Sequence, residues 1–132
     1  MRNVRDDQIK AVAASGGVIG VNGLGLLLGD PTASLEKYVE HIDYITQLVG
    51  SQYVALGLDN LYFADQFMEF MQSQQVSHPQ AYAQKVSDGI NWKCLQPEDV
   101  IGVVELLIQR DYSEAEIKGI LRENILRLMD RL

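Results

Sequence analysis

The sequence predicts a helix-rich α/β fold built around two parallel strands. Two short apolar segments of strand character, Gly17–Val21 and Tyr53–Leu58, are each bounded by glycine or polar residues. Between them, residues 32–49 carry apolar side chains at the i, i+3, i+4 and i+7 spacing of an amphipathic helix. Strands joined by a helix of this length are most simply adjacent and parallel, in a right-handed crossover.

The other elements are helices with recognisable ends. Asp6 or Asp7 can cap a first helix that stops at the Gly16-Gly17 pair, whereas residues 25–32 are typical of a loop. Pro97 opens a helix that runs to residue 110. Its expected buried stripe is Val100, Ile101, Val104, Leu107 and Ile108. A capping box, Ser113–Glu116, begins the last helix. Its expected stripe is Ile117, Ile120, Leu121, Ile125 and Leu128.

Residues 60–96 interrupt this regular order. Aromatic and apolar residues predict a helix in its first part, and a second short helix with a loop is expected further on. A connection of about 35 residues is far longer than usual after a strand, so we expect this insert to have a function or a partner of its own.

Two parallel strands do not make a complete sheet, because such strands need neighbours and cover on both faces. The chain is therefore expected to be part of a larger sheet. A mostly helical domain with a small two-stranded core remains the alternative.

The composition predicts one folded domain, since the 132 residues are 47% apolar. A net charge of −7 and scattered basic residues disfavour nucleic acid as a partner, because phosphate binding needs clustered Lys and Arg. No apolar run approaches the roughly 20 residues of a membrane-spanning helix, and the polar N-terminus shows no signal peptide. With Cys94 as the one cysteine, we expect a cytoplasmic protein.

The sequence offers no self-contained metal or nucleophile site. His41, His78 and Cys94 lack partners at ligand spacing, so no metal is expected on this chain alone. We interpret His41 as a hydrogen-bonded packing residue. The glycines in residues 20–25 do not have the spacing of a nucleotide-binding loop, and close backbone approach is their expected role. Binding of a nucleotide phosphate there is a weaker alternative.

Two polar residues follow the predicted strands. Asn22 ends the first and Asp59 the second. Because ligands of parallel α/β folds lie at the carboxyl ends of strands, both are candidate site residues. A local role for Asp59 as a turn-capping residue is an equally open interpretation.

Five motifs occur in order along the chain: Arg2-Asn3, Gly16–Ile19, His41–Ile45, Gly57–Asp59 and Glu123–Arg127. Together they resemble the Arg-Asn pair, G-G-V-I strand, H-I-x-Y-I helix, G-x-G-x-D strand end and E-N-x-L-R helix of the renal (membrane) dipeptidase family, in its C-terminal third. One of the two glycines before Asp59 is absent here. Residues 60–62 also replace the family's common F-D-G, so the loop on the substrate side differs.

This resemblance implies a partial (β/α)8 TIM barrel, with residues 1–132 as one C-terminal segment that supplies its last two strands. Arg2 matches the arginine that holds the terminal carboxylate of a dipeptide, a task suited to a bidentate guanidinium. Asp59 matches the catalytic aspartate beside the metal-bound water, and Asn22 is expected to bind substrate on the neighbouring strand. His41 matches a position that the family does not use as a metal ligand.

The family's cofactor is zinc, and its ligands belong to sequence upstream of Arg2. A barrel of this class has about 250 residues. We therefore expect this chain to supply no more than half of one, as a truncated reading frame or a split gene would.

The leading hypothesis is thus the C-terminal part of a zinc-dependent dipeptidase that is inactive as the isolated chain. The alternative is a non-enzymatic interaction module. Such a half-barrel would form a homo-oligomer or pair with a complementary N-terminal part, because exposed strand edges and one-sided helices favour partners.

Overall fold

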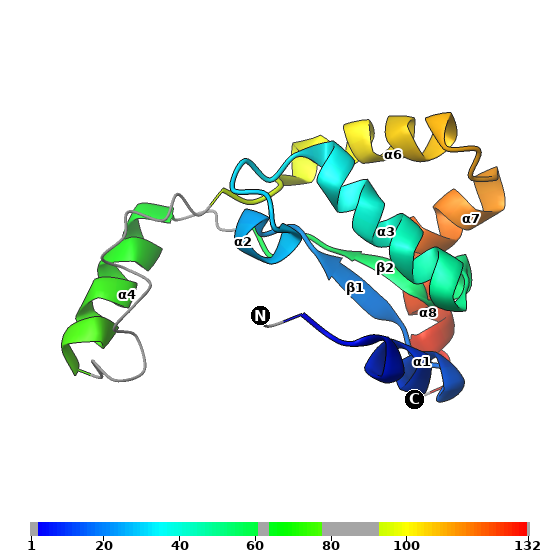
Figure 1. Cartoon of the computed structure of the whole chain (residues 1–132), viewed down its shortest axis with the longest axis horizontal. Coiled ribbons are helices and arrows are strands. Elements are labelled where there is room, and N and C mark those ends of the chain that lie inside the picture. The colour runs from blue at the N-terminus through cyan, green and yellow to red at the C-terminus, as the bar shows by residue number, and fades with distance from the viewer. Residues whose placement is uncertain (1–2, 61–63, 78–92, 132) are drawn as a thin grey trace.

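The computed structural model describes residues 3–60, 64–77 and 93–131 (Figure 1). Helices surround a parallel pair of strands, β1 (Ile19–Asn22) and β2 (Val54–Gly57). Helix α1 (Asp6–Ala14) precedes β1, and α3 (Leu35–Val49) connects the strands. The register pairs the first residues of the strands with each other and Asn22 with Gly57, so both strands end at one edge. The predicted helix-rich α/β class and the parallel pairing are confirmed.

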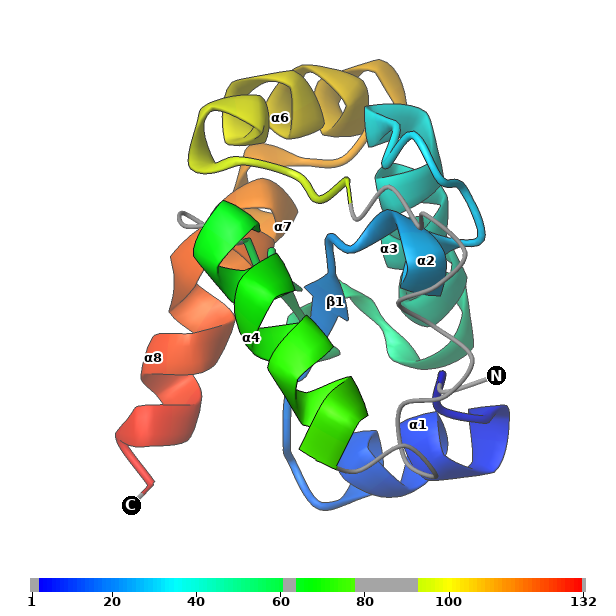
Figure 2. The same ribbon diagram turned by 90° about the vertical axis from the view of Figure 1, so that its left-hand side faces the viewer.

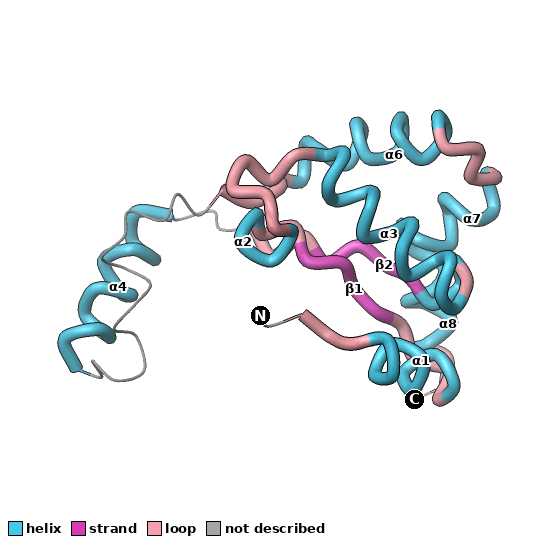
Figure 3. Tube along the Cα trace, viewed as in Figure 1, coloured by secondary structure: helices cyan, strands magenta, loops and turns pink. Residues whose placement is uncertain are grey.

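The remaining helices are α2 (Gly25–Leu28), α4 (Ala64–Ser77), α6 (Val100–Gln109), α7 (Glu114–Lys118) and α8 (Asn124–Met129). Short 3-10 turns, Ser51–Tyr53 and Pro97–Asp99, precede β2 and α6, and a π-helical turn, Gly119–Glu123, joins α7 to α8. Figure 3 shows the strands as a narrow central strip among these helices. Within the described ranges, no helix is both long and apolar enough to span a bilayer.

Local side-chain contacts explain where the helices begin. The backbone N–H of Arg5 donates to Oε1 of Gln8 at 2.9 Å, so the residue that caps α1 is Arg5, one position before the expected cap at Asp6 or Asp7. The hydroxyl of Ser34 caps α3. In the predicted capping box, the N–H of Ser113 donates to Oε2 of Glu116 at 2.9 Å. The interpretation of residues 25–32 as a loop was wrong for α2, which takes up their first four residues.

Tyr38 fixes α3 against both strands. It is fully buried, and its hydroxyl donates to the carbonyl oxygen of Val21 at 3.0 Å. The hydroxyl oxygen of Tyr38 in turn accepts from the N–H of Gly57 at 3.4 Å. Burial raises the pKa of the phenol to about 12. The side chains buried most completely around it are Val39, Ile42, Val54, Val103, Leu107 and Ile120.

The buried face of α6 differs from the predicted stripe. Val103 and Leu107 are fully buried, whereas Ile101 is 72% and Ile108 59% exposed. The sequence VIGVVELLI is apolar around almost the whole helix, so its spacing could not select one face.

The π turn changes which side of the last helix is buried. It adds a residue to one turn and so rotates the following side chains by about 100° relative to a regular helix. Leu121 and Ile125, expected in the core, are instead partly exposed, and Asn124 is buried. Nδ2 of Asn124 donates to the carbonyl oxygens of Ser51 at 2.9 Å and Val54 at 2.8 Å. The family-like motif around Asn124 therefore holds the last helix against the start of β2.

Helix α4 lies beyond the carboxyl ends of the strands and apart from the other helices (Figures 1 and 2). It contains the first predicted helix of the insert. The second falls largely within residues 78–92, which lie outside the described ranges.

Candidate active site

Asn22 and Asp59 meet at the carboxyl ends of the two strands. Nδ2 of Asn22 donates to Oδ2 of Asp59 at 2.8 Å. The backbone N–H of Leu24 donates to Oδ1 of Asn22, also at 2.8 Å, which fixes the orientation of the amide. Sequence reasoning placed both residues at this edge but did not anticipate the bond between them.

The backbone at Asp59 is unusual for a residue with a side chain. Its φ is +54°, in the left-handed region that Asp tolerates better than most residues. The side chain is exposed. The hydrogen bond found for its carboxylate within the described ranges runs to the other strand, not to the turn that follows Asp59. The arrangement thus orients an exposed carboxylate at the strand ends.

A third segment joins this edge after the insert. The N–H of Gly25 donates to the carbonyl oxygen of Lys93 at 2.9 Å, and the N–H of Leu95 donates to that of Gly23 at 3.0 Å. These two bonds form an antiparallel bridge between Leu24 and Cys94. The insert therefore leaves from the end of β2 and returns beside the end of β1.

The glycine cluster permits this close approach. A Cβ atom on Gly23 would lie 2.6 Å from the carbonyl oxygen of Leu58, and one on Gly25 would lie 2.5 Å from that of Asp30. Neither distance leaves room for a side chain, so the predicted role in backbone approach is confirmed. The phosphate-binding alternative remains a prediction.

Asp30 organises the loop between α2 and α3. Its carboxylate accepts hydrogen bonds from the backbone and hydroxyl groups of Thr32 and Ser34. These donors, above all the Ser34 hydroxyl, hold the pKa of Asp30 well below its usual range. This acid has a structural task and lies outside the Asn22–Asp59 pair.

The other predicted positions divide into two groups. His41 is half-buried on α3, with Nε2 3.2 Å from the carbonyl oxygen of Leu28, so its interpretation as a hydrogen-bonded packing residue is confirmed. Arg2 and His78 lie outside the described residues.

Across residues 3–60, 64–77 and 93–131, no three His, Cys, Asp or Glu side chains converge as metal ligands would. Zinc does not fit the side chains described here.

Comparison with known proteins identifies relatives of this chain. The family described as membrane dipeptidase (peptidase family M19) matches residues 1–76. A protein of Klebsiella pneumoniae described as an uncharacterized protein in the pqqA 5′ region is 43% identical over 63 residues, covering 44% of this chain and 23% of that protein. Dipeptidase 3 of Macaca fascicularis and of Homo sapiens are 27% and 24% identical over 127 residues, covering 96% of this chain and 21% of each relative.

The chain therefore spans about a fifth of the length of these relatives. No solved structure matched it. The family match covers more than half of the chain and includes both strands, Asn22 and Asp59. This chain belongs to the membrane dipeptidase family, peptidase family M19.

Proposed function

We propose that this chain is the C-terminal part of a zinc-dependent dipeptidase in which Asp59 acts as a catalytic proton acceptor. β1 and β2 would be the last two strands of its (β/α)8 barrel. The observation that carries the proposal is the position of Asp59: its carboxylate is exposed at the carboxyl ends of parallel strands and oriented by Asn22. Barrel enzymes place their catalytic groups at this edge.

Each polar residue at the edge receives a role in this proposal. Asn22 bonds one carboxylate oxygen, Oδ2, and leaves Oδ1 of Asp59 to accept a proton from the reacting group. Asn22 thus acts on substrate indirectly, through Asp59, rather than as the direct substrate ligand expected from the sequence. Arg2 would bind the carboxylate of the dipeptide.

Asn60 is a further candidate for contact with substrate. Its Nδ2 is buried and has no hydrogen-bond partner among the described residues. Buried amide donors are usually paired, because an unpaired one costs about 1–3 kcal/mol. A carbonyl or carboxylate oxygen of a bound dipeptide would satisfy this donor next to Asp59.

Zinc would have to be held by residues outside those described here. The isolated chain is therefore expected not to hydrolyse dipeptides. Hydrolysis by the purified chain, with zinc bound in stoichiometric amount, would contradict this proposal.

The direct test is a chimera. Residues 3–131 would replace the corresponding region of an active membrane dipeptidase, and hydrolysis of a dipeptide would be measured with and without Asp59→Asn. General acid–base groups contribute about 10²- to 10⁴-fold, so the substitution should lower kcat by at least about 100-fold. Glu105→Gln, an exposed acid on α6, is the matched control and should leave kcat unchanged. An active chimera that is indifferent to Asp59→Asn would refute the assignment.

A second candidate function is self-association without catalysis. Leu121, Ile125 and Met129 follow one another at four-residue spacing, and they are 37%, 40% and 61% exposed. Such a row favours a partner surface. Light scattering on the purified chain would then report a dimer that Ile125→Lys converts to a monomer and the control Glu98→Lys does not. A monomeric wild-type chain would remove this candidate.

A further inference from the structure

We propose that Tyr38 is a positioning residue for Asp59: its buried hydroxyl fixes the carboxyl ends of β1 and β2 relative to each other and so maintains the hydrogen bond that orients the Asp59 carboxylate. The hydroxyl donates to the carbonyl oxygen of Val21 at 3.0 Å and accepts from the N–H of Gly57 at 3.4 Å. Val21 directly precedes Asn22, and Gly57 lies two residues before Asp59. One hydroxyl thus contacts each strand just before its site residue. The catalytic part of this inference rests on the proposed function, whereas the geometry does not.

The bond between Asn22 and Asp59 depends on how the two strands lie at their last residues. The regular pairing ends with Asn22 opposite Gly57, and a backbone bond from the N–H of Gly23 to the carbonyl oxygen of Leu58 follows at 3.1 Å. The chain then turns at Asp59, whose φ is +54°. A small relative movement of the strand ends therefore directly changes the 2.8 Å separation of the two side chains.

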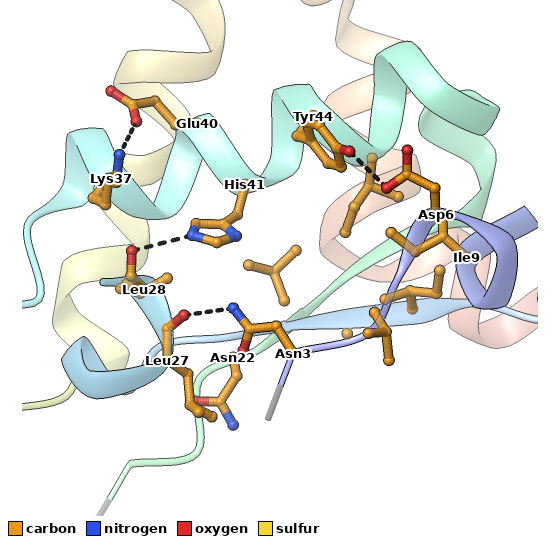
Figure 4. A pocket seen from close by; sticks show the side chains of 15 residues that line it. Asn3, Asp6, Ile9, Asn22, Leu27, Leu28, Lys37, Glu40, His41 and Tyr44 are labelled. Atoms are coloured by element: carbon orange, nitrogen blue, oxygen red, sulfur yellow. Dashed lines mark hydrogen bonds and ion pairs between the residues drawn. The ribbon is translucent and has the colours of Figure 1, made fainter. Parts of the chain in front are cut away.

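Tyr38 reaches the strands from the face opposite to Asn22. Side chains alternate between the two faces of a strand, and Val21 is buried in one core with Tyr38. The side chain of Asn22 extends away from α3 in Figure 4, in which His41 and Tyr44 mark that helix. The hydrogen bonds of Tyr38 among the described residues run to main-chain atoms. Its effect on the site therefore passes through the backbone.

The tyrosine hydroxyl is itself held in one place. Tyr38, Val39 and Ile42 of α3 are fully buried, and side chains in such a close-packed core have little room to move. Burial raises the pKa of the phenol to about 12, so at neutral pH the hydroxyl keeps its proton and its bond to Val21. The strands also lie close together here, since a Cβ atom on Gly57 would be 3.3 Å from the carbonyl oxygen of Val21. A fixed hydroxyl that contacts both strands leaves their ends little freedom to shift.

The first test uses the chain itself and follows the side-chain amide signals of Asn22 by NMR. Because this amide donates to the Asp59 carboxylate, its signals should shift in response to Asp59→Ala. Tyr38→Phe deletes the hydroxyl and keeps the ring, so in that background the shift should fall to less than about half of its wild-type size. Tyr112→Phe is the matched control, because it deletes a half-buried hydroxyl that donates to Oδ1 of Asp43 on α3 rather than to a strand. It should leave the shift unchanged.

The second test measures dipeptide hydrolysis by the dipeptidase chimera. Tyr38→Phe should lower kcat by about tenfold, because a catalytic group that is present but misdirected loses rate. KM should stay within about twofold, since Tyr38 does not contact substrate. Tyr112→Phe should change neither constant. In a chimera that already carries Asp59→Asn, Tyr38→Phe should have no further effect on kcat, because both substitutions act on the same group.

An Asn22 shift that Tyr38→Phe leaves at its wild-type size would overturn the proposal, whatever the activity of the chimera. Equal effects of Tyr38→Phe and Tyr112→Phe would overturn it too, because they would reflect lost stability alone. So would an unchanged kcat for Tyr38→Phe in a chimera that depends on Asp59. A reduced shift in a chain whose chimera is indifferent to Asp59→Asn would refute Asp59 as the proton acceptor, while the control of its orientation by Tyr38 would stand.

Discussion

Oδ2 of Asp59 accepts a 2.8 Å hydrogen bond from the side chain of Asn22, a residue 37 positions earlier in the chain. The two side chains extend beyond neighbouring parallel strands, so their contact depends on the register of the whole sheet. A bond of this kind between exposed groups adds modestly to stability. Its larger effect is to restrict the carboxylate to one orientation.

A double-mutant cycle can measure this bond. Asn22→Ala, Asp59→Ala and the double substitution would each be unfolded in urea. We expect a coupling free energy of roughly 0.5–1 kcal/mol, because removal of either partner should leave little for the second substitution to remove. Effects that add to within about 0.3 kcal/mol would show that the bond is not formed in solution.

Gly20 and Gly23 lie three residues apart, but replacement by alanine should destabilise the fold strongly at Gly23 and hardly at all at Gly20. Gly23→Ala places a methyl group 2.6 Å from a backbone oxygen and should lower the free energy of unfolding by more than about 2 kcal/mol. Gly20→Ala meets its nearest atom at 3.6 Å, an ordinary contact, so it should change stability by less than about 0.5 kcal/mol. Thermal or urea unfolding distinguishes the two, and similar losses would contradict the packing described here.

Tyr38 should make stability depend on alkaline pH. Its pKa is about 12 in the folded chain, against the ordinary value of about 10 when unfolded. The contribution of the neutral phenol is complete below pH 10 and is lost as the pH rises to 12, and two pKa units correspond to roughly 2–3 kcal/mol. Tyr38→Phe removes this dependence.

Urea unfolding at pH 9 and pH 12 would check the expectation. At pH 9 the wild-type chain should be more stable than Tyr38→Phe by about 1 kcal/mol, the value of the lost hydroxyl bonds. At pH 12 the order should reverse. The pKa of Tyr112 is also raised to about 12, but Tyr112 is present in both proteins, so its titration does not change the difference in stability between them. A constant gap at the two pH values would count against a buried Tyr38.

Asn124 should be among the most sensitive polar positions. Asn124→Ala removes the donors to Ser51 and Val54 and leaves the carbonyl oxygen of Val54 without this buried partner. The free energy of unfolding should therefore fall by about 2–3 kcal/mol. The adjacent and exposed Glu123 provides the control, since Glu123→Ala should cost less than about 0.5 kcal/mol. Equal losses at the two positions would indicate that the π turn is not formed.

Sequence reasoning succeeded where a pattern depends on local chemistry. The capping box at Ser113 and the two glycine-bounded strands follow from nearest neighbours. The predicted parallel pairing placed Asn22 and Asp59 at one edge of the sheet, although the hydrogen bond between them was not predicted. These inferences needed only spacing and the rule that a helix of this length connects parallel neighbours.

Local sequence patterns did not predict features that depend on distant parts of the chain. The apolar α6 has several possible buried faces, and its contacts with α3 select one. Asn124, just after the π turn, bonds carbonyl groups 73 and 70 positions earlier in the chain, which no local window contains. The bridge between Leu24 and Cys94 likewise forms only once the insert has returned to the sheet.

The insert begins just after β2 and rejoins the chain beside Gly23, so its two ends are neighbours in space. Lengthening a loop whose ends are already close costs little, about 0.6 kcal/mol for each doubling. Evolution can therefore enlarge, shorten or exchange the part of the insert before Lys93 while the core of the molecule, which includes Leu95, stays the same. Differences among family members in the substrates or partners that they bind would then be concentrated in this insert.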